Sequence, residues 1–214
     1  MKWNLENLSE NDTLNILIVG VGGQGSLLIS KIIGKAALSA GKKVTISEIH
    51  GMAQRGGVVE TLVRLGEDES PVTNDIHILL SLEPAEVLRN LHRLRQDTVI
   101  ITSENEIVPF TVSLGVADYP DISSSFSKLR EKFSNFISVD ALKLAKEAGN
   151  PITSNVVLLG CLSALKVFPL QVEVLEETLK NSVPSGTEEL NLRAFKLGRE
   201  YIFSAKKKKE SLNG

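Results

Sequence analysis

The fold class of this chain follows from one stretch near its start, Asn15-Ile16-Leu17-Ile18-Val19-Gly20-Val21-Gly22-Gly23-Gln24-Gly25. Its apolar first half predicts a buried strand, and an apolar helical pattern follows over Gly23–Ala40. The glycines fit the spacing G-x-G-x-x-G, which allows a tight turn at Gly20, close approach of a phosphate at Gly22 and close packing of helix and strand at Gly25. The helix would direct free N–H groups at a ligand above the loop. This context favours a phosphate- or nucleotide-binding loop over a tight turn without a ligand.

A second loop rich in chemical groups follows the second predicted strand, Lys43–Ile49. The segment Glu48–Gly57 brings together an imidazole, an amide, a guanidinium and three glycines. In a parallel sheet this loop would lie beside the first, at the carboxyl edge of the strands where ligands bind. Arg55 can hold a phosphate or carboxylate with its fork of donors, and His50 and Gln54 can supply hydrogen bonds. The alternative is a structured turn with a β-bulge at Gly56-Gly57 and solvated polar groups.

Two further polar residues have both a functional and a structural interpretation. Glu48 follows Gly25 by 23 residues, and an acid at this place in a dinucleotide-binding fold would hold the ribose hydroxyls. A backbone group or an arginine could equally hold this carboxylate at the end of its strand. Asn155 lies near the start of a predicted apolar helix, Ile152–Phe168, and its amide is expected to cap the helix or to bond to the local backbone.

Composition places the chain among ordinary globular proteins. It has 214 residues, 42% of them hydrophobic, which is enough for one sizeable core. A net charge of -2 and 5% aromatic residues give no reason to expect nucleic acid as a partner. No apolar run is long enough to cross a membrane, and the polar residues 1–13 do not form a secretory signal. The single cysteine, Cys161, suits a reducing cytoplasm, and the scattered histidines predict no metal site.

The hydrophobic pattern predicts a three-layer Rossmann-like α/β domain with a mostly parallel or mixed sheet and a helical C-terminal portion. Further strands are expected at Val58–Leu65, Ile76–Leu82, Thr98–Ser103 and Phe136–Val139. Further helices are expected from Glu83-Pro84 through Leu94, and at Ser123–Lys132, Ala141–Ala148, Ile152–Phe168, Gln171–Asn181 and Thr187–Ser204. We predict an N-terminal arm over residues 1–14, one domain over residues 15–204, and a flexible basic tail over residues 205–214.

Taken together, several segments resemble a known family in sequence and in order. The chain is similar to the gamma-type subunits of 2-oxoacid:ferredoxin oxidoreductases and, within that family, to the beta subunits of the enzymes that act on indolepyruvate. The resemblance covers most of the chain, and the segment after the second predicted strand is its most specific part. The matching segments are Ile18–Gly25, Ser47–Gly57, Ser70-Pro71, Leu80–Glu86 and Asn155–Gly160.

The resemblance implies a subunit of an enzyme that oxidatively decarboxylates a 2-oxoacid with coenzyme A and passes the electrons to ferredoxin. Thiamine diphosphate, magnesium and iron–sulfur clusters are then expected on a large partner subunit. This chain agrees with that division, because it has one cysteine and no Gly-Asp-Gly motif, so it is not expected to be active alone or to hold a catalytic residue. Coenzyme A is expected at its surface. The expected cofactor-binding residues are Gly20, Gly22, Gly23, Gln24, Gly25, Glu48, His50, Gln54, Arg55, Gly56 and Asn155.

Three hypotheses follow. The leading one is a partner subunit that completes the active site of such an enzyme, with indolepyruvate or another arylpyruvate as substrate. In it, Arg55 binds an anion, Gln54 and His50 supply hydrogen bonds, and Glu48 orients the loop. The second is an independent oxidoreductase with NAD or FAD, for which Glu48 is the best support. The third is a structural or regulatory partner subunit whose glycine loop binds nothing.

Overall fold

A computed structural model describes residues 13–51, 57–66, 75–108, 112 and 118–212. The strands are β1 (Leu14–Val21), β2 (Val44–His50), β3 (Val58–Leu65), β4 (Ile76–Ser81), β5 (Leu94–Ser103) and β6 (Phe136–Val139). The α-helices are α1 (Ser26–Ser39), α2 (Pro84–Arg89), α4 (Ile122–Lys132), α5 (Ala141–Ala148), α6 (Ser154–Ser163), α7 (Val172–Lys180) and α8 (Glu188–Leu212). Two short 3-10 helices, η1 (Leu91–Arg93) and η2 (Pro151–Thr153), complete the described elements.

Six strands form one mixed sheet in the order β2-β3-β1-β4-β5-β6. β1, β4, β5 and β6 are parallel neighbours. β3 runs antiparallel to both β1 and β2, so β2 points in the same direction as β1 but is separated from it by one strand. The predicted α/β domain with a mostly parallel or mixed sheet is confirmed, and β3 is the strand that makes the sheet mixed.

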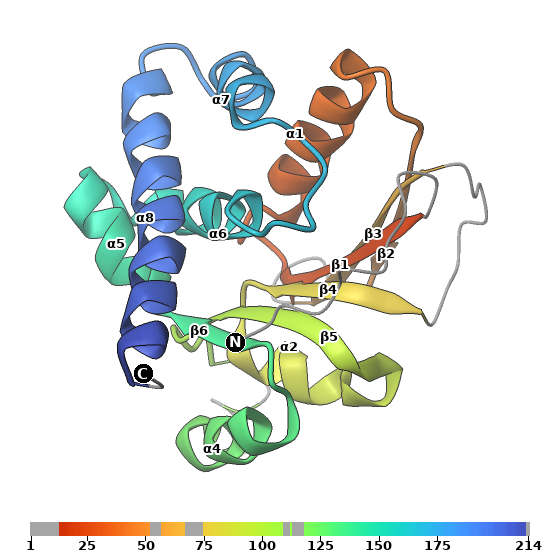
Figure 1. The fold of residues 1–214 in the computed structure, drawn as a ribbon, viewed down its shortest axis with the longest axis vertical. Coiled ribbons are helices and arrows are strands. Elements are labelled where there is room, and N and C mark those ends of the chain that lie inside the picture. The colour runs from red at the N-terminus through yellow and green to blue at the C-terminus, as the bar shows by residue number, and fades with distance from the viewer. Residues whose placement is uncertain (1–12, 52–56, 67–74, 109–111, 113–117, 213–214) are drawn as a thin grey trace.

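Helices cover both faces of the sheet, as the three-layer prediction requires. Figure 1 shows α1, α5, α6, α7 and α8 on one face and α2 and α4 on the other. Strand side chains alternate between the faces, and two hydrophobic clusters result. Ile16, Ile18 and Leu80 belong to the larger cluster with α1 and α6, whereas Leu17 and Leu79 belong to the smaller cluster with α2 and α4.

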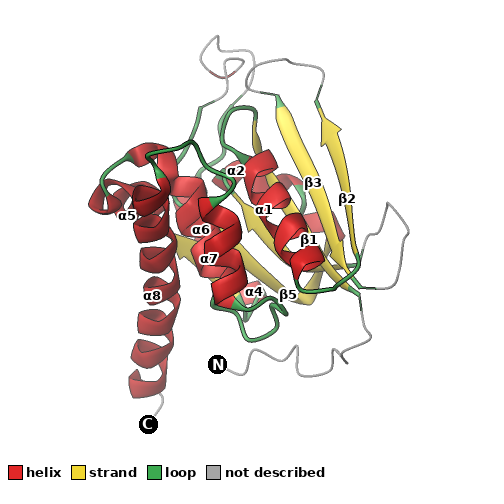
Figure 2. Ribbon diagram, turned by 90° about the horizontal axis from the view of Figure 1, so that it is seen from above, coloured by secondary structure: helices red, strands yellow, loops and turns green. Residues whose placement is uncertain are grey.

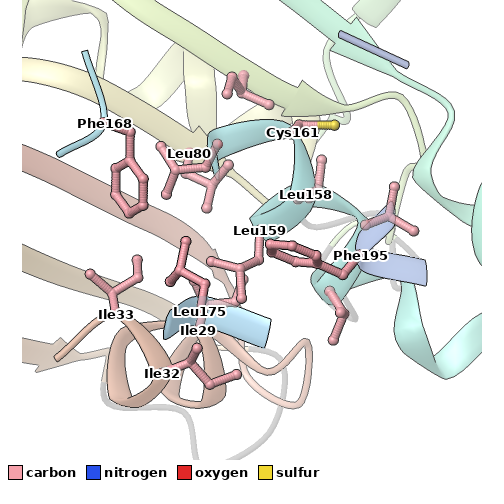
Figure 3. Packing of buried hydrophobic residues seen from close by; sticks show 14 of the residues in the cluster. Ile29, Ile32, Ile33, Leu80, Leu158, Leu159, Cys161, Phe168, Leu175 and Phe195 are labelled. Carbon is pink, nitrogen blue, oxygen red and sulfur yellow. The ribbon is translucent and has the colours of Figure 1, made fainter. Parts of the chain in front are cut away.

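The larger cluster is built around α6, whose residues are apolar on almost every side. Leu158, Leu159 and Cys161 of α6 pack among side chains of α1, α7 and α8 (Figure 3). The Cys161 thiol lies 3.2 Å from the carbonyl oxygen of Gly198, and burial raises the pKa of this thiol. Cys161 is therefore a core residue, as its position in an apolar run predicts.

Three predicted helices end five or more residues away from the observed end. The helix that begins at Pro84 ends at Arg89 rather than continuing through Leu94, because the Asn90 amide donates to the Glu86 carbonyl (3.0 Å) and a 3-10 turn follows. α6 ends at Ser163, where the Arg199 guanidinium donates to the terminal carbonyl (3.1 Å). α8 continues to Leu212 and so extends into the predicted flexible tail, because lysine, glutamate and leucine favour helix and no glycine intervenes.

Candidate functional site

The candidate site lies along the carboxyl edge of the sheet. β1, β2 and β4 all end at this edge and β3 begins there; Figure 2 shows this for β2 and β3. The Gly22 N–H, in the loop after β1, donates to the Gly57 carbonyl just before β3 (2.9 Å). The two loops are therefore neighbours, linked at the residue that precedes β3.

The chain changes direction at this edge, between β1 and β4. From β1 it continues into α1 on one face of the sheet, and from β4 into α2 on the other face. In open α/β sheets, ligands bind outside the strand ends at such a topological switch point. The glycine loop lies at this switch point, directly after β1.

The Gln24 side chain spans the switch point. Its Oε1 atom accepts the Val21 N–H (2.7 Å) and its Nε2 atom donates to the Leu82 carbonyl just after β4 (2.9 Å). Both ends of the amide are therefore bonded to backbone, and Gln24 joins β1 to β4. Gly20 is required for this arrangement, because a Cβ there would lie 2.6 Å from Oε1 of Gln24. Gln24 thus holds the loop in shape, a role that its place in a glycine motif does not reveal.

Gly25 sits where α1 meets α6. Its φ of 85° lies in the left-handed region, which glycine adopts at little cost. A Cβ at Gly25 would lie 2.2 Å from Nδ2 of Asn155, so the last glycine of the motif permits contact between two helices rather than between helix and strand. The Asn155 Oδ1 atom accepts the next backbone N–H, that of Val156 (2.9 Å). This is the local bonding expected of Asn155, and the same residue is also brought to the glycine loop.

The glycine loop presents backbone donors to its surroundings. No side chain caps α1, and the first N–H groups of a helix have no acceptor within the helix. Gly22 and Gly23 are exposed, and a Cβ at Gly23 would meet nothing within 4 Å. The positive end of the α1 dipole therefore lies under an open stretch of backbone, which is the arrangement that binds phosphates at helix N-termini.

Glu48 lies too far from this loop for the usual ribose contact. In a dinucleotide-binding fold the acid ends the strand next to β1, but here β3 lies between β1 and β2. Two strand spacings separate Glu48 from β1, roughly 10 Å. Its carboxylate instead faces α1, where Oε1 lies 3.5 Å from the Ser30 hydroxyl. The sheet order therefore does not favour the NAD or FAD hypothesis.

The structure describes only part of the second loop. His50 is the last residue of β2, and its backbone pairs with Val59. Gln54, Arg55 and Gly56 lie outside the described residues, so their roles stay predictions. What the structure shows is that both ends of the loop, at Gly51 and Val58, are held together by a hydrogen bond (2.8 Å) at the edge of the glycine loop.

Two buried acids next to the switch point were not among the predicted site residues. Glu83 caps α2 by accepting the Glu86 N–H (3.2 Å), and it also accepts a hydrogen bond from the Tyr119 hydroxyl. Glu86 pairs with Arg89 through Oε1 (2.8 Å), whereas its buried Oε2 has no partner within the described chain. Burial raises the pKa of Glu86 to about 7, against the opposing effect of Arg89. The sequence feature that could have pointed to them is a pair of acids three residues apart, directly after a buried strand.

Other kinds of site find no support in the described ranges. No three His, Cys, Asp or Glu side chains of these ranges are grouped so that they could hold a metal ion. None of the described helices is long and apolar enough to cross a membrane.

The sequence matches the family model described as "Pyruvate ferredoxin/flavodoxin oxidoreductase" over residues 15–201. One relative is indolepyruvate oxidoreductase subunit IorB of Thermococcus kodakarensis, which is 44% identical over 188 residues, covering 86% of this chain and 93% of that protein. The subunit of the same name from Pyrococcus horikoshii is 42% identical over 203 residues, covering 93% and 98%. The chain is thus comparable to these subunits over nearly their whole length.

Solved structures show the same fold. The gamma subunit of a keto/oxoacid ferredoxin oxidoreductase from Geobacter sulfurreducens superposes with a TM-score of 0.69 at 24% identity, covering 91% of this chain and 98% of that one. A 2-oxoglutarate:ferredoxin oxidoreductase from Magnetococcus marinus, with 2-oxoglutarate, coenzyme A and succinyl-CoA bound, superposes with a TM-score of 0.70 at 20% identity. Here the match covers 91% of this chain but only 32% of that chain, so this fold is one part of a longer polypeptide.

Proposed function

The chain belongs to the pyruvate ferredoxin/flavodoxin oxidoreductase family, and from this premise we propose that it completes the active site of a complex that oxidises 2-oxoacids. It is the small subunit of a 2-oxoacid:ferredoxin oxidoreductase, and its substrate is indolepyruvate or another arylpyruvate. The relatives that are 44% and 42% identical are both indolepyruvate oxidoreductase subunits, which supports an aromatic 2-oxoacid.

The observation that carries this proposal is the pair of joined loops at the carboxyl edge. An uncapped helix begins there under exposed glycine backbone, and the second loop is tied to the first by the bond from Gly22 to Gly57. Coenzyme A carries several phosphate groups, which suit backbone N–H donors at a helix N-terminus. We assign the phosphate-bearing part of coenzyme A to this edge.

The second loop supplies the side chains of the proposed site. The Arg55 guanidinium binds a phosphate oxygen of coenzyme A, His50 and Gln54 add hydrogen bonds, and Glu48 orients the loop from β2. Gln24 and Asn155 act through the backbone of the glycine loop, because the Gln24 amide bridges to Leu82 and Asn155 packs on Gly25. These two are positioning residues, whereas Arg55 touches the ligand.

The redox chemistry belongs to the partner subunit. Cys161 is the single cysteine of this sequence and is buried in the core, whereas the common iron–sulfur clusters need several cysteine ligands. Thiamine diphosphate, magnesium and the clusters are therefore assigned to a large subunit, and ferredoxin meets the assembled complex. We place the complex in the cytoplasm, where a reduced thiol is stable.

Arg55→Ala in the reconstituted complex tests whether the edge binds coenzyme A. Loss of a charge-assisted bond to phosphate should raise the KM for coenzyme A about tenfold or more and leave the KM for arylpyruvate nearly unchanged. Lys196→Ala is the matched control, because Lys196 is an exposed cation on α8, away from the proposed site. An unchanged KM for coenzyme A in Arg55→Ala would favour the structural or regulatory role.

Calorimetry on the isolated chain separates the proposal from the stand-alone NAD or FAD enzyme. NADH and FAD should show no binding in the micromolar range, because Glu48 is one strand too far from the glycine loop for the ribose contact. Micromolar binding of either cofactor, together with its loss in Glu48→Ala, would support the independent oxidoreductase instead.

A further inference from the structure

The Leu80–Glu86 segment is one of those on which the family resemblance rests, and the proposed site uses only the Leu82 carbonyl from it. The segment contains the end of β4, the turn into α2 and the first residues of α2. Glu83 lies in this turn, and its side chain is buried. A buried carboxylate is costly unless its oxygens accept hydrogen bonds, so the oxygens of Glu83 need partners within the fold.

Both side-chain oxygens of Glu83 have partners, and these come from two different parts of the chain. Oε2 accepts the Glu86 N–H in the first turn of α2 (3.2 Å). Oε1 accepts a hydrogen bond from the hydroxyl of Tyr119, which lies shortly before α4. The Glu83 carbonyl accepts the Ser81 hydroxyl (2.6 Å). The side chain and the backbone of Glu83 are therefore both held in place.

The peptide bond between Leu82 and Glu83 connects this arrangement to the glycine loop. The Leu82 carbonyl belongs to that bond and accepts a hydrogen bond from Nε2 of Gln24 (2.9 Å). Because a peptide bond is planar, a rotation of the backbone at Glu83 also turns the Leu82 carbonyl away from Gln24. Oε1 of the same Gln24 amide accepts the Val21 N–H in the glycine loop (2.7 Å). Loss of the Glu83 contacts would therefore reach the glycine loop through one amide.

Resting on the proposed function, we propose that Glu83 is a positioning residue for the coenzyme A site. It holds the Leu82 peptide in the orientation that fixes Gln24, and Gln24 in turn fixes the glycine loop. This role requires no contact between Glu83 and the ligand, because both side-chain oxygens are used within the fold. The parts of a binding site must be held within about 0.5 Å, so a residue behind the site can change the affinity.

Amide hydrogen exchange in the full-length chain tests the link from Glu83 to the loop. In Glu83→Ala, the Val21 N–H should exchange at least about fivefold faster than in wild type, because its acceptor on Gln24 is no longer fixed. The Ile100 N–H is the internal reference, because it donates to the Asn135 carbonyl (2.9 Å), away from the switch point. No acceleration at Val21, or an equal acceleration at Ile100, would overturn the proposal.

Glu83→Gln tests whether hydrogen bonding is the way in which Glu83 holds the turn. Glutamine keeps an oxygen that can accept the Glu86 N–H and gains an amino group that can donate to the Tyr119 oxygen. The exchange rate of the Val21 N–H should therefore stay within about twofold of wild type. Exchange as fast as in Glu83→Ala would overturn the proposed positioning by hydrogen bonds.

Asp140→Ala is the matched control for the loss of a helix cap. The Asp140 carboxylate caps α5 by accepting the Lys143 N–H (3.0 Å), and it also accepts a hydrogen bond from the Asn105 side chain (3.2 Å). It follows β6, which β5 separates from β4, so its loss should leave exchange at Val21 within about twofold of wild type. Acceleration at Val21 equal to that in Glu83→Ala would show that the effect is not specific to Glu83 and would overturn the proposal.

The affinity of the reconstituted complex for coenzyme A, measured by calorimetry without 2-oxoacid, tests the effect on the ligand. Glu83→Ala and Gln24→Met should each raise the Kd about fivefold or more. The double variant should stay within about twofold of Gln24→Met alone, because the two residues act in series. A Kd in the double variant equal to the product of the two single effects would overturn the action of Glu83 through Gln24.

The outcomes separate this inference from the proposed function. A raised Kd for coenzyme A in Gln24→Met, with a wild-type Kd in Glu83→Ala, would overturn only the role of Glu83 and leave the proposed function intact. A wild-type Kd in both Gln24→Met and Arg55→Ala would contradict the proposed function itself, whatever the exchange rates show.

Discussion

A single amide, that of Gln24, joins the two strands on either side of the switch point. Its Oε1 and Nε2 atoms satisfy one N–H group and one carbonyl that the ends of β1 and β4 would otherwise leave unpaired. Gly20 and Gly25 leave the space that Gln24 and Asn155 fill. The glycine loop is therefore shaped by two side chains that approach it from inside the domain, while Gly22 and Gly23 on its outer side are exposed.

Replacing Gln24 with methionine should lower the free energy of unfolding by about 1–3 kcal/mol. Methionine has nearly the same length but leaves the Val21 N–H and the Leu82 carbonyl without their partners, and unpaired backbone groups are costly when removed from water. Urea unfolding measures the change. Gln171→Met is the control, because Gln171 is exposed and its side chain caps nothing. Equal stability of the two variants would show that the bridge contributes nothing.

Glu86 should make the stability of the chain depend on pH. Its pKa is raised from 4.5 to about 7 in the folded state, chiefly by burial, with Glu83 and Glu60 adding to the shift and Arg89 opposing it. Between these two values the folded chain binds more protons than the unfolded chain, so stability falls as the pH rises. The loss develops from about pH 4.5 and is complete above about pH 7, reaching at most about 3 kcal/mol.

Glu86→Gln tests this dependence, because glutamine has nearly the same shape and does not ionise. The free energy of unfolding of the variant minus that of wild type should therefore be larger at pH 8 than at pH 5, as measured by urea unfolding at both pH values. Arg89→Gln is a useful second variant, because Arg89 opposes the raised pKa of Glu86. Without this cation, the chain should lose more stability than wild type on going from pH 5 to pH 8. A constant difference between wild type and Glu86→Gln over this range would contradict the raised pKa.

Single residues differ in how far the sequence predicts their roles. The glycines could be assigned, because glycine spacing at a strand-to-helix junction reports on local backbone. The hydrogen-bond partner of the Gln24 side chain could not be predicted, because Leu82 is 58 residues away and the contact depends on which strands become neighbours in the sheet. Glu83 and Glu86 were visible as acids three residues apart, but only the structure shows that both are buried.

Among the elements, the crossing of α6 and α8 is the tightest contact. A Cβ at Gly160 would lie 2.0 Å from the Phe195 carbonyl oxygen, and a Cβ at Gly198 would lie 2.0 Å from the Val157 carbonyl oxygen. Each of the two helices therefore places a glycine directly against the backbone of the other helix. This contact fixes α6, and through Asn155 it fixes the position of the glycine loop.

Gly160→Ala should destabilise the chain strongly, by more than about 3 kcal/mol, because the backbone of α8 cannot move without opening the core. Gly34→Ala in α1 is the matched control. Its Cβ would meet the end of the Ile46 side chain at 2.7 Å, and that side chain is partly exposed on the edge strand β2 and can rotate. Alanine favours helix over glycine by about 1 kcal/mol, so this variant should be neutral or more stable. Thermal unfolding compares the two, and equal midpoints would contradict the contact.

Periodicity predicts the elements better than their arrangement. The strand Phe136–Val139 and the helix Ala141–Ala148 match the structure residue for residue, because each has a clear apolar pattern and Asp140 marks the boundary by accepting the Lys143 N–H. The insertion of β3 between β1 and β2 could not be predicted, since an alternating strand fits either place in a sheet. That placement matters for function, because it carries Glu48 away from the glycine loop.

At the scale of the whole molecule, the glycine loop and the two described ends of the second loop lie together at the carboxyl edge of the sheet. The opposite ends of the strands carry none of the predicted site residues. This asymmetry matches a chain that presents one prepared surface to a partner, and the family to which it belongs acts on 2-oxoacids. The resemblance to the family implied a partner subunit, and the single cysteine agrees with that expectation.

The most direct test of the central claim is the turnover of the purified large subunit with and without this chain. The assay follows reduction of ferredoxin by indolepyruvate in the presence of coenzyme A. We predict little or no turnover by the large subunit alone and a saturable rise as the chain is added, with the rise lost when coenzyme A is omitted. Full coenzyme A-dependent turnover by the large subunit without this chain would contradict the account.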